Sequence, residues 1–131
     1  MGTWDAGNLD NDYALDELSE RLDKLVKGLW SRAKKKTSRE GDEYDYTTLF
    51  VEFEILFALE DRKLVRERCG AMPTPDEVEK VKLNFINEWD ANIDALEPTE
   101  EHKQNRRKVI LQTFNRFKRI CRRHHPPEDS A

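Results

Sequence analysis

This sequence is short of cysteine, glycine and proline, and it contains no long apolar run. Its 131 residues include two Cys, five Gly and five Pro. Two cysteines are too few for a disulfide framework, so we expect Cys69 and Cys121 to be reduced thiols of a cytoplasmic protein. No stretch approaches the roughly 20 apolar residues of a membrane-spanning helix, and no Gly-rich phosphate-binding loop is present. We therefore expect neither a disulfide scaffold nor a membrane protein.

The sequence also has no large excess of one sign of charge, because 23 basic residues nearly balance 27 acidic ones and leave a net charge of −4. The balance is uneven along the chain. Residues 70–101 carry nine acids and two lysines, whereas residues 102–125 carry nine Lys or Arg and no acid. An acidic body followed by one basic helix differs from the uniformly basic pattern of a nucleic-acid-binding protein.

Metal-binding motifs are absent from the sequence. Cys121, His124 and His125 offer three ligand types within five residues, but zinc sites draw their ligands from two segments with fixed spacing. The remaining candidates, Cys69 and His102, belong to no such pair. We interpret the Cys/His cluster as the frayed end of a basic helix and expect no metal and no cofactor.

A catalytic constellation is also missing. No Ser/His/Asp or Cys/His arrangement has a local signature. Glu52 and Glu54 lie in the most apolar segment, yet two residues apart on a helix they point roughly 200° from each other and cannot share a proton or a metal. We expect them, together with Glu60 and Asp61, to lie at a solvated edge or to pair with arginines of the last helix. The sequence therefore predicts no enzyme and no catalytic residue.

The first sixteen residues form a recognisable opening segment. An early Trp4 is followed by a bend at Gly7 and by Asp10-Asn11-Asp12, a cluster that predicts a helix N-cap. The segment resembles the start of a bacterial family of small proteins of unknown function, which open Met-Gly-Ala/Thr-Trp-Gly-x-Gly-x-Phe-Asp-Asn-Asp-x-Ala. Residues that match are Met1, Gly2, Thr3, Trp4, Gly7, Asp10, Asn11, Asp12, Ala14 and Asp16, whereas Asp5 and Leu9 depart from the pattern. The resemblance implies a bacterial origin and a fold, but no chemistry.

Apolar periodicity predicts four helices, over residues 12–31, 47–69, 74–97 and 99–125. The first has a stripe of Leu15, Leu18, Leu22, Leu25, Val26 and Leu29. The third has a capping box at Thr74-Pro75-Asp76-Glu77, ends at Pro98 and has the stripe Val78, Val81, Phe85, Trp89, Ile93 and Leu96. The fourth follows Thr99 and has the stripe Val109, Ile110, Phe114, Phe117, Ile120 and Cys121.

The second predicted element is ambiguous. Residues 51–55 alternate between apolar and acidic, as a strand does. The apolar run nevertheless continues to Leu64 and Val65, which is longer than an ordinary strand, and Gly70 with Pro73 would stop a helix. We therefore expect a central helix that is apolar on most of its faces.

The resulting fold class is all-α: a compact four-helix antiparallel bundle with a long polar loop, residues 32–45, between the first two helices. A single helical domain should cover residues 1–125. Residues 126–131 should form a disordered tail.

The candidate binding site combines carboxylates with tyrosines. Acids can mimic phosphates and speed encounter with a basic surface, while tyrosines supply rigid contact area. The predicted partner-binding residues are Asp42, Glu43, Tyr44, Asp45 and Tyr46 of the loop, with Asp76, Glu79, Glu88 and Asp90 of the third helix. The alternative is that the loop is merely solvated and its tyrosines pack back on the bundle.

The predicted function is that of a binding module. Small, acidic, cytoplasmic helical proteins are similar to the immunity proteins of contact-dependent and other polymorphic toxins, which implies a cognate toxin neutralised by occlusion of its active site. One alternative is a nucleic-acid-associated regulator that uses Arg106, Arg107 and Arg119 of the basic helix. A second is a structural protein that closes a homo-oligomer through apolar surface, and a third is a catalytic function built on Glu52, Glu54 or Glu60.

Overall fold

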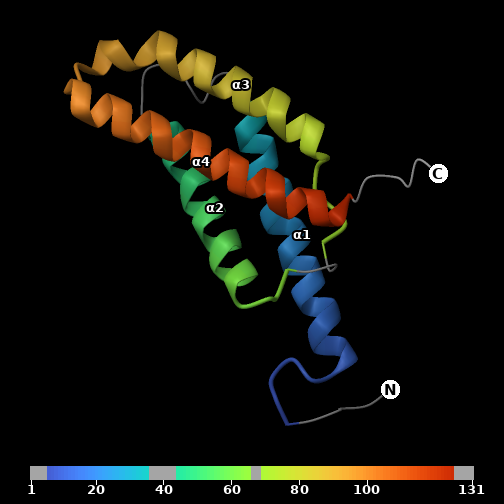
Figure 1. Cartoon of the computed structure of the whole chain (residues 1–131). Helices are drawn as coiled ribbons and strands as arrows, with labels where there is room; N and C mark the ends of the chain where they lie inside the picture. Colours follow the sequence, from blue (N-terminus) through green and yellow to red (C-terminus); the bar gives the residue numbers. More distant parts are fainter. Residues whose placement is uncertain (1–5, 36–43, 66–68, 126–131) are drawn as a thin grey trace.

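The computed structural model describes residues 6–35, 44–65 and 69–125. Within these ranges the regular elements are helices, and the all-α bundle expected from the sequence is confirmed (Figure 1). The elements are α1 (Asp12–Lys34), α2 (Tyr44–Asp61), α3 (Pro75–Asn92), the short 3-10 helix η2 (Ile93–Leu96) and α4 (Glu100–His124). Trp4 of the opening segment and the predicted tail 126–131 lie outside the described residues.

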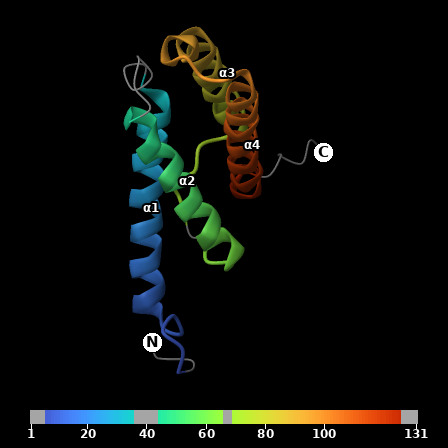
Figure 2. The same ribbon diagram turned by 90° about the vertical axis from the view of Figure 1, so that its left-hand side faces the viewer.

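The helices form two antiparallel pairs that pack across each other. α1 runs antiparallel to α2, and α3 runs antiparallel to α4 (Figure 1). Seen after a quarter turn, the α1/α2 pair and the α3/α4 pair lie side by side as two layers (Figure 2). The first turns of α1 extend beyond the other helices in both views.

Helix α1 begins as the sequence predicts. The side chain of Asn11 caps the helix, because its Oδ1 accepts a hydrogen bond from the backbone N–H of Ala14 at 2.8 Å. The helix continues to Lys34, one turn past the predicted end at Ser31. Consequently the connection to α2 is shorter than the predicted loop 32–45, and most of it lies outside the described residues.

Helix α2 settles the ambiguity at residues 51–55, which are helical. Its predicted end is wrong, however, because the helix stops at Asp61 rather than Cys69. Lys63 adopts a left-handed conformation with φ 62°. Its backbone N–H donates a hydrogen bond to the carbonyl of Glu60 at 2.8 Å, and the N–H of Leu64 donates one to the carbonyl of Leu59 at 3.0 Å. These two hydrogen bonds form a Schellman cap without glycine.

The connection after α2 contributes to the core although it is not helical. Val65, Cys69 and Met72 are all buried. Their burial explains why an apolar run in the sequence continued past the end of the helix, since apolar side chains of a connecting segment are removed from water as effectively as those of a helix.

The α3/α4 pair begins at two well-defined caps. Thr74 and Glu77 form the predicted capping box at the start of α3, and Thr99 caps α4 by accepting a hydrogen bond from the N–H of His102 at 3.1 Å. Most residues of the two predicted apolar stripes are buried. Leu96 and Val109 are exceptions, exposed by 44% and 45%, so both were wrongly predicted to face the core.

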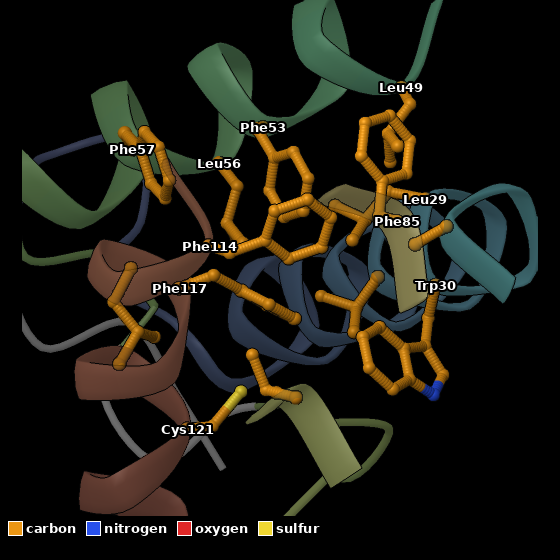
Figure 3. Close-up of a cluster of buried hydrophobic side chains, with 14 of the residues drawn as sticks. Leu29, Trp30, Leu49, Phe53, Leu56, Phe57, Phe85, Phe114, Phe117 and Cys121 are labelled. Carbon is orange, nitrogen blue, oxygen red and sulfur yellow. The ribbon is translucent and has the colours of Figure 1, made fainter. Parts of the chain in front are cut away.

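Aromatic rings join the two layers. Phe53 of α2 contacts Phe114 and Phe117 of α4, with ring centroids 5.4 and 5.2 Å apart. Trp30 of α1 lies 5.9 Å from Phe117, so one ring cluster connects α1, α2 and α4 (Figure 3). Phe85 of α3 completes it, 5.4 Å from Phe114. Edge-to-face and tilted ring pairs of this kind add to the free energy gained from burial.

Candidate functional site

Tyr46 occupies the core rather than an exposed loop. Only 6% of it is exposed, and its ring packs against Phe50 and Phe85 at centroid distances of 6.2 and 5.8 Å. Its predicted role as a partner contact is therefore corrected, and the alternative in which it packs on the bundle holds for this residue. Asp42 and Glu43 lie outside the described residues, as do the side chains of Tyr44 and Asp45, whose backbone forms the first turn of α2.

The predicted acids of α3 are partly neutralised within the fold. Glu79 pairs with Lys82 at 2.8 Å and with Lys118 of α4 at 3.0 Å, and hydrogen bonds from these two lysines lower the pKa of its carboxyl. Asp90 accepts two hydrogen bonds from the guanidinium of Arg107, at 2.9 and 3.0 Å. Carboxylates engaged in this way hold two helices together, which leaves them less able to attract a partner.

The remaining predicted acids of α3 lie apart from each other. Asp76 is exposed in the first turn of α3, where a carboxylate interacts favourably with the helix dipole. Glu88 is half-buried one turn before the end of α3, and its backbone carbonyl accepts a hydrogen bond from the side chain of Asn92. The structure therefore does not gather the predicted α3 acids into one exposed site.

A surface of the predicted chemistry does occur, but on α1. Tyr13 is 83% exposed, the largest exposure among the large apolar or aromatic side chains described. Asp16, Glu17 and Glu20 follow at three, four and seven residues, so they lie on the same side of the helix, and all three are exposed. Glu17 also pairs with Arg21 at 3.0 Å, but both side chains of this pair are largely exposed, and the pair does not join two helices. We call these four residues the α1 acidic face.

The α1 acidic face stands clear of the core. No described side chain of α1 before Leu22 is fully buried. Leu18, on the opposite side of the helix, packs against the core, whereas Tyr13 is exposed to solvent. A signal was available in the sequence: residues 10–20 contain five acids and no base, and Tyr13 falls on the polar side of the apolar stripe.

A second unusual surface lies on the outer side of α2. Val51, Ile55 and Ala58 are all exposed there, at a spacing of four and three residues. With Phe50 and Arg106 they line a hollow of about 500 Å³. A neighbouring hollow of about 450 Å³ includes Val109 of α4. We call Val51, Ile55 and Ala58 the α2 apolar face.

The basic residues of α4 are largely engaged inside the molecule. Besides Arg107 and Lys118, ion pairs are formed by Lys103 with Asp94, by Arg116 with Asp61 and by Arg123 with Glu60. The guanidinium of Arg106 lies over the ring of Phe50, 4.6 Å from its centroid. Of the three arginines considered for nucleic acid, Arg119 alone has no such contact within the described part of the chain.

The cysteine and histidine side chains at the end of α4 contact the protein itself. His124 Nδ1 lies 3.2 Å from the carbonyl oxygen of Ile120, and His125 Nε2 lies 2.8 Å from that of Met72. Cys121 is buried with its Sγ 3.9 Å from the sulfur of Met72. Among the described residues, no group of three or more Cys, His, Asp or Glu is arranged to hold a metal ion.

The carboxylates of α2 are separated as helical geometry requires. Glu52 pairs with Arg32 of α1 at 2.6 Å, whereas Glu60 pairs with Arg123 of α4. The expected ion pairs with arginines of the last helix are thus found for Glu60 and for Asp61. Glu54 is exposed and lines both hollows beside the α2 apolar face.

No protein-family model, curated protein or solved structure matches this chain. The resemblance of its opening residues to a bacterial family therefore stays a prediction. Over the described ranges, none of the helices combines the length and apolar character needed to cross a membrane.

Proposed function

We propose that this chain is a protein-binding module of the immunity type, which neutralises a cognate bacterial toxin by covering its active site with the α1 acidic face. The observation that supports the proposal is the position of Tyr13, an aromatic side chain 83% exposed beside Asp16, Glu17 and Glu20. Aromatic rings are enriched at the centres of protein interfaces, and here the ring lies on the same side of the helix as three carboxylates.

The chemistry of the α1 acidic face suits a basic partner. Enzymes that cleave nucleic acids bind phosphates through a basic cleft, and carboxylates can take the place of those phosphates. The acids would speed the encounter through long-range attraction, while Tyr13 would supply buried contact area once the complex has formed. Because the face lies on a helix that extends beyond the bundle, it could reach into a concave site.

The nucleic-acid alternative receives less support from the contacts of α4. Arg107 is held by Asp90 and Arg106 by the ring of Phe50, so binding to phosphates would first have to break these contacts. Phosphate binding dominates affinity for nucleic acids, and each arginine already paired contributes less to it.

The proposal is tested by affinity capture from a nuclease-treated lysate of the native host, with the wild-type chain and a Tyr13→Ala/Glu17→Lys variant as baits. Capture of one stoichiometric protein by the wild type alone is expected, and its toxic activity should be inhibited by the wild type and not by the variant. Leu83→Ala is the matched control, since Leu83 of α3 is exposed but lies outside the α1 acidic face. Equal capture by wild type and variant would exclude this face, and material that is lost on nuclease treatment would favour α4 instead.

A further inference from the structure

Helix α2 carries apolar side chains on its outer side in addition to those that it packs into the core. Its inner side packs Leu49, Phe53 and Leu56 into the core, where each is at most 1% exposed. Its outer side presents Val51 and Ile55, which are 52% and 47% exposed. A surface helix of a monomeric protein normally turns polar residues to water, so apolar residues on both sides indicate a second contact.

The hollows extend this surface from α2 onto α4. The first is lined by the α2 apolar face together with Phe50, which is half-buried. The second continues to Val109, which is 45% exposed and fails to reach the core. Because Glu54 lines both hollows, they form one surface of apolar and polar side chains that runs from α2 to α4.

Charges of both signs accompany the apolar residues. Glu54 lines both hollows, while Arg106 lines only the first and Arg119 only the second. Neither Glu54 nor Arg119 has an ion-pair partner within the described residues. An acid thus lies between two arginines on one surface, which makes the surface complementary in charge to itself.

We propose that a second copy of this chain covers the α2 apolar face, in a dimer with two-fold symmetry. In such an interface every residue contributes twice, so the short row Val51, Ile55 and Ala58 becomes a seam between two α2 helices. Glu54 of one copy can then meet an arginine of the other. A partner with charge of one sign only would leave either Glu54 or the arginines unmatched.

This dimer is independent of the proposed toxin-binding function. The α1 acidic face belongs to a different helix and to the part of α1 that extends beyond the bundle. Dimerisation through α2 can therefore fail while toxin capture succeeds, and the reverse also holds, so the two results are distinguishable.

Sedimentation equilibrium of the full chain tests the dimer, over concentrations from about 1 μM to about 1 mM, a range that includes weak and moderate dissociation constants. The wild type is expected to dimerise, and Ile55→Lys should raise the dimer dissociation constant at least about tenfold because a charge would enter the seam. Helical circular dichroism should stay unchanged, since Ile55 is half-exposed. Val51→Lys is a second variant with the same expectation, and Leu83→Lys, on the exposed surface of α3, is the control that should leave dimerisation unaltered.

A further variant, Glu54→Arg, tests the charge complementarity of the proposed interface. Glu54→Arg makes the surface entirely positive, so we expect a dimer at least about tenfold weaker than the wild type. A chain that stays monomeric throughout the range would overturn the proposal and leave the face to a different protein. A dimer that tolerates Ile55→Lys or Glu54→Arg would overturn it equally, because the contact would then lie elsewhere.

Discussion

Burial decides the chemistry of the two cysteines. Cys69 and Cys121 are both buried, on the connection after α2 and on α4. Desolvation raises the pKa of the Cys69 thiol to about 11 and that of Cys121 to about 12. Because the thiolate is the reactive form, both side chains should behave as small apolar groups rather than as nucleophiles.

The raised thiol pKa values predict a stability that falls at high pH. Protonated thiols favour the folded state, so this contribution is complete below the pKa of an unfolded cysteine and is lost as the pH rises through about 11 and 12. Urea unfolding across the alkaline range should show the decline, and it should be smaller in a Cys69→Ala/Cys121→Ala variant. At about pH 8 a disulfide reagent should label the thiols only after unfolding. Rapid labelling of the folded protein would contradict their burial.

Lys63 has a backbone conformation with a measurable energetic cost. It closes α2 with φ 62°, a conformation that glycine adopts without the steric penalty of a Cβ atom. Lys63→Gly should therefore raise the free energy of unfolding by about 1 kcal/mol, as measured by urea denaturation. Lys63→Ala is the control and should bring no such gain, because alanine keeps the Cβ atom. Equal stabilities of the Gly and Ala variants would show that the cap is not strained.

At the scale of the elements, the sequence predicted well where a helix has one apolar side and a marked start. Asn11, Thr74 and Thr99 all cap the helices that follow them, as their side-chain chemistry suggests. The starts of α3 and α4 follow from these caps, whereas α3 ends at Asn92 and is continued by the 3-10 helix η2, short of the end at residue 97 that Pro98 predicted. Such signals are local, so they can be read without knowledge of the fold.

For helix α2 the sequence predicted neither the side that faces the core nor the residue at which the helix ends. Its apolar residues surround the helix, so no periodicity distinguishes the side that faces the core from the side that faces water. The end of α2 was missed because Val65 and Cys69 are buried in a non-helical connection. Tyr46 was placed on the surface because its neighbours are acids, whereas packing against Phe85 of a distant helix decides its position.

The contacts between α3 and α4 predict a structural role for Arg107. Its guanidinium donates two hydrogen bonds to Asp90, which raise its pKa. Because the pair is partly exposed, Arg107→Ala should lower the free energy of unfolding by no more than about 1 kcal/mol. The control is Lys108→Ala, an exposed side chain with no ion-pair partner among the described residues, and it should cost less. If urea denaturation gave the same decrease in the free energy of unfolding for both variants, the contact with Asp90 would not contribute to stability.

At the scale of the whole molecule, one core joins the two helix pairs. Phe53 of α2 is fully buried against rings of α4, and Phe85 of α3 belongs to the same cluster (Figure 3). Neither pair can bury its apolar side alone, so unfolding should involve both pairs together.

Phe53→Ala is therefore expected to destabilise the entire protein, by about 3–5 kcal/mol, because it leaves a cavity between the layers. Tryptophan fluorescence and helical circular dichroism should give coincident urea transitions in both wild type and variant, since Trp30 and Trp89 report on different pairs. Leu83→Ala is the surface control and should change stability by less than about 0.5 kcal/mol. Two separate transitions would mean that the pairs fold independently.

The arrangement of surfaces follows from this shared core. The α3/α4 pair uses its charges internally, while the first turns of α1 present Tyr13, Asp16, Glu17 and Glu20 away from the bundle. A partner that recognises these residues would interact with the charges of the three carboxylates and make contact with the ring of Tyr13.

The most direct measurement is the affinity of the captured, purified partner for the wild type and for Tyr13→Ala, by isothermal titration at low and at high salt. We predict a dissociation constant raised at least about tenfold by Tyr13→Ala, and an affinity of the wild type that falls as salt screens the acids. An affinity unchanged by Tyr13→Ala and insensitive to salt would contradict binding through the α1 acidic face.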